Sequence, residues 1–376
     1  MAQRHLDPTD PTAEAVTGDA LASYLRAQAT EFLRALRLHR ETGGNGAGGP
    51  ARGHAAAGAQ ESVDAARALR RSARRISGSL HTFRPLLDPA WSEEMRPELA
   101  WLSGTLGLEH SYEARLERLL LALHRLSGAA VLPAQTVDAL AAAGRTGGTA
   151  PLPGTAAPEH TGGPAGTERG SLTVGAAKAG ALLERQLTLA RTRAHSTALQ
   201  ALGSSRFHAV ADKVAVLASE VPLSPAAPAT GLHPLAGAAE ERLTDAIAAL
   251  PLITAGHPYN AEALVHGLSP DPSPHPQDGP WHQVRLLLRL HRYAREVLYR
   301  GEAPVDMRLL TAGQALNRHR DASEAAAAAA QAARTPRITP ATAYALGVLH
   351  ADQRHEVEAA RFAFQQAWQR QPVDVP

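Results

Sequence analysis

The sequence predicts an all-α fold, built as two pseudo-symmetric antiparallel bundles of long helices. Hydrophobic residues make up 44% of the 376 residues but aromatic residues only 4%, and alanine is the dominant apolar type. Alanine has the highest helix propensity, whereas strands favour β-branched and aromatic residues. Apolar residues recur at helical spacing along the chain, with no alternating strand pattern and no repeat of about 20–50 residues.

Stretches rich in glycine and proline separate the predicted helices. Residues 41–60, 144–170 and 269–280 have the composition of loops. We expect one domain over residues 18–370, with a first bundle (18–143), a flexible Gly/Pro linker (144–170) and a second bundle (171–370). Helices are expected at residues 18–40, 61–86, 92–107, 110–127, 175–201, 204–219, 234–250, 281–301, 305–317, 320–334 and 338–370.

The composition also indicates the cellular location of the protein. The absence of cysteine excludes disulfides and thiolate zinc sites. The first residues, MAQRHLDPTDPTAEAV, lack the apolar segment of a signal peptide, and nowhere do about 18 apolar residues run together. We therefore expect a cytoplasmic protein that does not enter the membrane.

Charge is unevenly distributed along the chain. The net charge of +2 by itself argues against a general polyanion binder. However, residues 61–86 contain six arginines against two acids, and residues 281–300 contain five against one. Only two of the 38 basic residues are lysines. A GC-rich genome would also enrich arginine, which explains the overall bias but not the clustering. The planar fork of arginine suits phosphate groups.

The first cluster forms a stripe along its predicted helix. At about 100° per residue, its basic residues fall within an arc of roughly 140°: Arg67, Arg70, Arg71, Arg74, Arg75 and His81. The opposite side is apolar: Leu69, Ala73, Ile76, Leu80 and Phe83. A solvated helix face normally mixes such arginines with acids, yet no acid lies between Asp64 and Asp88. An anionic ligand is the better interpretation.

The second cluster forms a narrower stripe, within an arc of ~80°. Its members are His282, Arg285, Arg289 and Arg292. An apolar face lies beside it: Leu286, Leu287, Leu290, Ala294 and Val297, widened by Val284 and Leu288. If the bundles pack pseudo-symmetrically, the two stripes face each other across a groove.

These stretches resemble the CHAD family, the conserved histidine α-helical domain. RALRRSARRISGSLHTFRPLL resembles the family's opening motif, with Arg70, Arg74 and Arg75 at arginine positions and His81 at the later basic one. ELAWLSGTLGLEHSYEARLERL resembles its L-x-W-L-x-x-x-L-G-x-x-R-D segment. HQVRLLLRLHRYAREVL resembles H-x-x-R-x-x-x-K-x-x-R-Y-x-x-E, and ALNRHRDASEAA resembles L-G-x-H-x-D with His319 at the histidine position. The resemblance covers about residues 18–370.

The resemblance implies two pseudo-symmetric helical bundles that bind inorganic polyphosphate, where phosphate would favour charged histidines at His282 and His319. The chain departs from the family pattern in the first half. Arg67 replaces a histidine, Ser77 an arginine, and His110 with Ser111 an Arg-Asp pair. We therefore expect Arg289→Ala and Arg292→Ala to weaken binding more than Arg74→Ala, whose neighbouring arginines would cover its loss.

No enzyme motif accompanies the stripes. There is no G-x-S-x-G sequence or Walker loop, and His350, His355 and Glu358 do not form H-E-x-x-H. We expect no catalytic residues, no cofactor and no metal. The predicted partner is inorganic polyphosphate, and granules of that polymer are one location in the cell where the protein is expected. The alternatives are a general polyanion or nucleic-acid backbone binder, disfavoured by the scarcity of stacking aromatics, and a degenerate helical scaffold.

Overall fold

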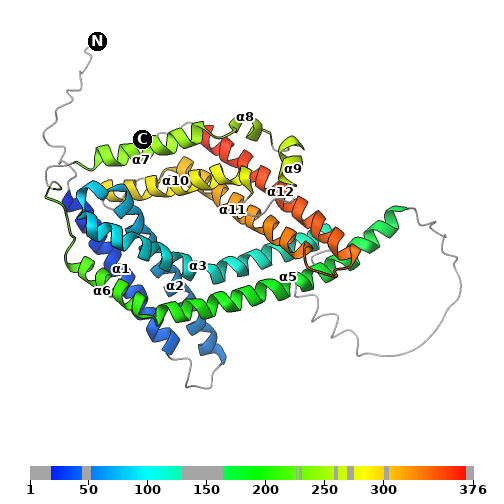
Figure 1. The fold of residues 1–376 in the computed structure, drawn as a ribbon, viewed down its shortest axis with the longest axis horizontal. Helices are drawn as coiled ribbons and strands as arrows, with labels where there is room; N and C mark the ends of the chain where they lie inside the picture. Colours follow the sequence, from blue (N-terminus) through cyan, green and yellow to red (C-terminus); the bar gives the residue numbers. More distant parts are fainter. Residues whose placement is uncertain are drawn as a thin grey trace, which may run out of the picture.

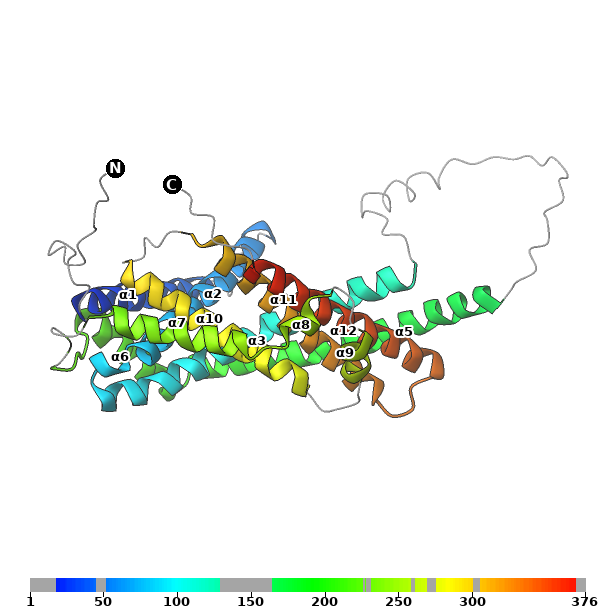
Figure 2. The same cartoon turned by 90° about the horizontal axis from the view of Figure 1, so that it is seen from above.

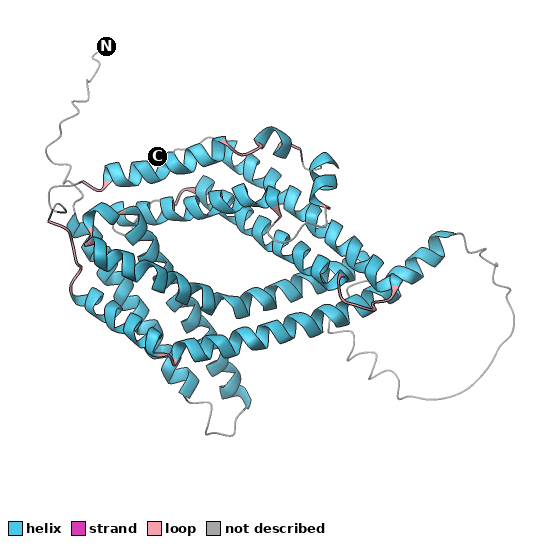
Figure 3. Ribbon diagram, viewed as in Figure 1, coloured by secondary structure: helices cyan, strands magenta, loops and turns pink. Residues whose placement is uncertain are grey.

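The computed structural model describes residues 18–44, 52–128, 164–225, 227, 231–257, 261–268, 275–299 and 305–369. Within these ranges the regular structure is helical and no strand occurs (Figure 3). Leu87 and Leu223 form an isolated antiparallel bridge between two connections. The predicted all-α class is confirmed.

Figure 1 shows the order and arrangement of the helices. In chain order they are α1 (Gly18–Gly44), α2 (Arg52–Thr82), α3 (Pro89–Leu126), α5 (Pro164–Leu202), α6 (Ser205–Ser219), α7 (His233–Ala248), α8 (Leu252–Ala255), α9 (Ala261–Gly267), α10 (Gly279–Leu298), α11 (Met307–Ala333) and α12 (Pro340–Gln369). Two single 3-10 turns, η2 (Arg84–Leu86) and η3 (Pro276–Asp278), precede α3 and α10.

Several helices are longer than predicted. Residues 92–107 and 110–127 form the single helix α3, and residues 305–317 and 320–334 form α11. The predicted break in α3 followed Gly107, and a glycine inside a helix costs only about 1 kcal/mol, which tertiary packing readily offsets. Helices α2 and α5 begin inside the stretches predicted as loops, at Arg52 and Pro164. Residues 45–51 and 144–163 of those two stretches lie outside the described residues, as do residues 129–143 of the predicted first bundle.

Side-chain caps fix three of the helix starts. The carboxylate of Asp88 accepts a hydrogen bond from the backbone N–H of Trp91 at 2.8 Å, at the start of α3. Ser204 caps α6 through the N–H of Phe207 at 3.2 Å, and Asp306 caps α11 through that of Leu309 at 3.0 Å. Each cap satisfies a backbone donor that has no partner within its helix.

Three groups of buried apolar side chains hold the helices together. The first joins α1, α2, the first half of α3 and α6, with Phe32, Ile76 and Phe207 fully buried. The second joins the end of α3 to α5, α11 and α12, and the third joins α7, α10, α11 and α12 around Trp281 and Phe364. Helices α3 and α5 run side by side (Figures 1 and 2).

The two predicted bundles share these cores. Ala294 and Val297 of α10 lie in the first group, together with side chains of α1 and α2. The second group combines helices from before and after residues 144–170. The division into pseudo-symmetric bundles stays a prediction. No helix in the described residues is long and apolar enough to cross a membrane.

Candidate anion-binding site

Helices α2 and α10 pack directly against each other and bring the two predicted stripes together. The apolar face of α2 is buried as predicted, from Leu69 to Phe83. Gly78 allows the close approach, because a Cβ atom there would lie 2.6 Å from Cδ2 of Tyr293 on α10. On α10 the predicted apolar face is buried at Val284, Leu288 and Ala294, but Leu286 is 44% exposed and was placed on that face wrongly.

The stripe on α2 divides into two sides. Arg75 makes a bidentate ion pair with Glu296 of α10, at 2.7 and 3.2 Å. The hydroxyl of Tyr24 on α1 donates to the same carboxylate at 2.8 Å, and burial raises the pKa of Tyr24. Arg71 is exposed and lines a cavity with Arg75 beside α1. These two arginines therefore face α1.

The other side of the stripe, Arg70 and Arg74, lies near three arginines of α10 and α11. We call these five residues the arginine cluster. Its five members lie on three helices, and the charge of Arg320 lowers the pKa values of the other four. The five members are Arg70 and Arg74 of α2, Arg285 and Arg289 of α10, and Arg320 of α11.

Positive charge is concentrated in the arginine cluster at a cost to the folded state. Burial, followed by the neighbouring arginines, lowers the pKa of Arg74 to about 10 and that of Arg285 to about 9. The same causes lower the pKa of Arg70, and burial with Arg320 and Arg292 lowers that of Arg289. All of them remain protonated at pH 7, so the cluster keeps its like charges in proximity.

Few anionic partners neutralise this charge. Arg74 and Arg289 make no hydrogen bond or ion pair with any residue in the described part of the chain. Arg70 donates from Nε to the carbonyl oxygen of Ser103 at 3.0 Å, and Arg285 donates from Nε to Oδ1 of Asn317 at 2.8 Å. These two acceptors are neutral. Buried charges are ordinarily paired, so an anion is the partner that the cluster needs.

Gly107 of α3 gives one member of the cluster its position. A Cβ atom at Gly107 would overlap the guanidinium of Arg70, so the glycine lets that side chain lie flat on α3. The sequence predicts that a helix ends at this glycine. Instead, the glycine lets Arg70 approach α3 closely while the helix continues unbroken.

Arg320 is the member that sequence reasoning missed. It forms an ion pair with Asp321 and lies 3.8 Å from Glu324. Together with Arg70 it lines a cavity of about 190 Å³, called the smaller cavity below. The available signal was its place in the NRHRD stretch of the motif at His319, one position from the histidine.

Besides Arg71 and Arg75, three more predicted site residues lie outside the cluster, and these three are exposed. Arg67 is exposed and pairs with Asp64 at 3.1 Å, one turn earlier on α2. His81 is exposed at the end of α2, where burial and the nearby Arg96 lower its pKa. Arg292 is exposed and lines a cavity with Tyr24, on the α1 side of α10.

His282 lies at the edge of the cluster. It is half-buried, and its Nε2 lies 3.4 Å from Oγ of Ser323. Burial lowers its pKa, and the nearby Arg285 and Arg320 lower it further. A neutral imidazole at pH 7 follows from these shifts, rather than the charged form expected from the family resemblance.

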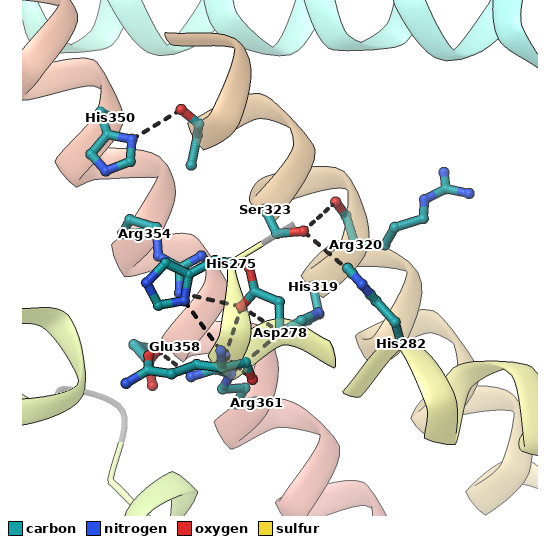
Figure 4. A network of polar contacts seen from close by, with 12 residues as sticks. His275, Asp278, His282, His319, Arg320, Ser323, His350, Arg354, Glu358 and Arg361 are labelled. Carbon is teal, nitrogen blue, oxygen red and sulfur yellow. Dashed lines mark hydrogen bonds and ion pairs between the residues drawn. The ribbon is translucent and has the colours of Figure 1, made fainter. Parts of the chain in front are cut away.

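His319 lies in the interior instead of facing the groove. Its side chain is 1% exposed, and Nε of Arg361 donates to its Nε2 at 3.3 Å. Burial lowers its pKa to about 4, so the ring is neutral at pH 7. This placement does not fit direct contact with phosphate. Figure 4 shows His319 within a buried network, while the side chain of Arg320 extends away from it.

Asp278 is the centre of that buried network. It accepts hydrogen bonds from Arg354 at 2.7 and 3.2 Å and from Arg361 at 2.7 Å (Figure 4). Burial raises the pKa of Asp278, but the nearby His319 and the hydrogen-bonded Arg354 outweigh it and hold the pKa well below its usual range. Arg361 also pairs with Glu358 at 2.7 Å. The network ties η3 to α11 and α12 beneath the start of α10.

The histidine in this network predicts a pH-dependent stability. The unfolded chain takes up a proton at His319 near pH 6.5, whereas the folded protein does so only near pH 4. Between these values the unfolded state binds more protons, so the free energy of unfolding falls as the pH falls. We expect a loss of up to roughly 3 kcal/mol across this window from His319. Urea denaturation at a series of pH values measures it.

The variant His319→Gln should flatten the pH dependence, and the exposed His208→Gln serves as its control. A variant His319→Gln that retains the full dependence would show that other groups cause it.

The described residues contain no group of three or more histidines, aspartates or glutamates that could hold a metal ion. His350 donates from Nδ1 to the carbonyl oxygen of Ala326 at 2.9 Å, and Glu358 is buried with Arg361. His355 is exposed. These three residues are close in sequence, but they have different surroundings and do not form one metal site.

The chain is similar to a known protein family and to a solved structure. The family model of the CHAD domain matches residues 51–305. The solved structure of PptA from Streptomyces chartreusis is 67% identical to the chain, with a TM-score of 0.71, and the match covers 94% of this chain and 99% of that one. No curated protein matches.

Proposed function

The chain belongs to the CHAD family, and we propose that it binds inorganic polyphosphate at the arginine cluster without catalysing a reaction. One observation carries the proposal: five arginines from three helices gather at one place, and two of them, Arg74 and Arg289, have no anionic partner within the described residues.

Polyphosphate matches the chemistry of this cluster. Each phosphate unit carries negative charge and oxygen atoms that accept two hydrogen bonds from one guanidinium. A bound chain would supply acceptors to Arg74 and Arg289 and reduce the repulsion among all five arginines. The neutral partners of Arg70 and Arg285 orient their side chains and leave the charge available.

The proposed site is smaller than the stripes predicted from the sequence. The direct ligands are Arg70, Arg74, Arg285, Arg289 and Arg320, with His282 and Arg292 at the edge. Arg75 acts as a structural contact between α2 and α10, because Glu296 already neutralises it. Asp321 and Glu324 compete with phosphate for Arg320 and lower the affinity.

A general polyanion or nucleic-acid backbone binder is the alternative. Proteins that bind single-stranded nucleic acid stack bases on exposed aromatic rings. Tyr293, which lies close enough to Arg74 and Arg289 to affect their pKa values, packs on Gly78 instead. We expect long-chain polyphosphate to bind about tenfold or more tightly than single-stranded DNA of equal charge, in competition titrations at one ionic strength. Equal affinities would favour the general polyanion binder.

The absence of catalysis is part of the proposal. It is supported by the lack of nucleophile and metal motifs in the sequence. Purified protein incubated with polyphosphate and Mg²⁺ or Mn²⁺ should release no phosphate. Sustained release that follows the protein through purification would replace the proposal with a phosphatase. In the cell, such a binder would act by recruitment, for example to polyphosphate granules.

A further inference from the structure

A second, larger cavity lies next to the arginine cluster. Its volume is about 600 Å³, and α3, α5, α11, α12 and η3 contribute to its lining. Small-molecule sites in proteins typically have volumes of about 300–1,000 Å³, mostly apolar walls and a few polar groups. The larger cavity has the size of such a site, and the proposed binding of polyphosphate does not use it.

One wall of the larger cavity is apolar. Leu183 and Leu187 of α5 face it, together with a row of alanines on α11: Ala326, Ala327, Ala328 and Ala330. A phosphate chain against this wall would lose its hydration without gaining hydrogen bonds. A flat organic ring would bury apolar surface there.

The polar side of the larger cavity also fits a largely neutral group. Two of its arginines are already neutralised, Arg354 by Asp278 and Arg115 by Glu324, at 2.7 and 2.5 Å. His282 and Ser323 lie beside them on the same side. Carboxylates, a hydroxyl and an imidazole are suitable partners for sugar hydroxyls and for the N–H groups of a heterocycle.

The larger cavity adjoins the arginine cluster. Arg115 and Glu324 line both the larger and the smaller cavity, so their ion pair forms the boundary between them. Nε of Arg115 is buried and has no acceptor among the described residues. His282 lines the larger cavity and is close enough to Arg285 and Arg320 for their charges to lower its pKa. A ligand in the larger cavity therefore has arginines within reach of an anionic tail.

We propose that the larger cavity binds the nucleoside part of a nucleoside polyphosphate, whose phosphates lie on the arginine cluster. The base packs against the alanine row of α11, and the sugar faces Glu324 and His282. This inference rests on the proposed function, because the phosphate tail uses the arginines assigned to polyphosphate. Nucleotide and polyphosphate therefore compete for the same arginines.

The experiment compares ATP, inorganic triphosphate and adenosine by calorimetric titration of the full chain. ATP should bind the wild-type protein about tenfold or more tightly than triphosphate, because burial of the base adds to the same phosphate contacts. Long-chain polyphosphate should displace ATP. Equal affinities for ATP and triphosphate would overturn the inference.

Two variants fill the larger cavity without touching the arginines. Ala327→Phe and Ala330→Phe place a bulky ring on the α11 wall, and Ala343→Phe, at a half-buried alanine outside the cavity, is the matched control. Each cavity variant should lower ATP affinity to that of triphosphate and leave polyphosphate affinity unchanged, whereas the control should retain the preference for ATP. Intact polyphosphate binding also shows that the variant is folded.

The outcomes separate the two proposals. If both cavity variants bind polyphosphate and still prefer ATP, the nucleoside lies elsewhere and this inference is wrong while the proposed function stands. If the wild-type protein binds neither polyphosphate nor triphosphate, the proposed function is wrong, and the nucleotide site is wrong with it.

Discussion

Replacement of Arg74 and Arg289 by glutamine is expected to weaken polyphosphate binding more than removal of any two exposed arginines. Each side chain can offer charge-assisted hydrogen bonds that no protein group now accepts. Such bonds contribute about 1–3 kcal/mol each, so the double variant should lose roughly a hundredfold or more in affinity. Calorimetric titration with long-chain polyphosphate measures the loss.

The same double variant should be at least as stable as the wild-type protein. Glutamine keeps much of the aliphatic stem but removes charges that burial and neighbouring arginines disfavour. The matched control is Arg67→Gln with Arg71→Gln, which removes the same formal charge from exposed positions on α2. If the control loses as much affinity as the cluster variant, binding depends on total charge rather than on the arginine cluster.

These expectations revise the asymmetry inferred from the sequence. Arg74→Ala was expected to cost less than Arg289→Ala, because neighbouring arginines would cover it. Arg75, however, is held by Glu296, and Arg71 faces α1. We now expect Arg74 and Arg289 to contribute similarly, and the exposed Arg292 to contribute less.

Asp278→Asn is expected to cause the largest loss of stability in the protein. The substitution preserves the shape of the side chain but leaves Arg354 and Arg361 buried without their shared carboxylate. Breaking a buried ion pair on one side typically costs about 3–5 kcal/mol. Urea denaturation at pH 7 measures the change in the free energy of unfolding.

An ion pair at the surface provides the control for this substitution. Asp352 accepts from Arg125 at 2.8 Å, and the Arg125 side chain is 58% exposed. Exposed pairs contribute about 0–1 kcal/mol, so Asp352→Asn should change stability little. Equal effects of the two substitutions would mean that the buried network does not hold η3, α11 and α12 together.

Local spacing was sufficient to predict most of the length of the long helices and the two stripes. The apolar face of α2 repeats at helical spacing, and all of its predicted members from Leu69 to Phe83 are buried. The predicted breaks within α3 and α11 were wrong. In α3 the predicted helix end was at Gly107, and tertiary packing decides whether a glycine ends a helix. Gly107 is retained inside α3 by its contact with Arg70, which lies far away in the sequence.

The exact membership of the site depended on packing that spacing does not contain. A helical stripe of roughly 140° is wide enough to face two neighbours, and α2 presents Arg70 and Arg74 to one side and Arg71 and Arg75 to the other. His319 and Arg320 are adjacent in sequence and therefore point in different directions on α11. One enters the core and the other joins the arginine cluster.

The most direct test of the central claim is the titration of long-chain polyphosphate into the wild-type protein at two ionic strengths. Binding through five arginines should release about that many counterions, so affinity should fall roughly a hundredfold between ~50 and ~200 mM salt. The Arg74→Gln, Arg289→Gln variant should show a shallower dependence. Absence of binding at the lower salt concentration, or an affinity that does not change with salt, would contradict the account.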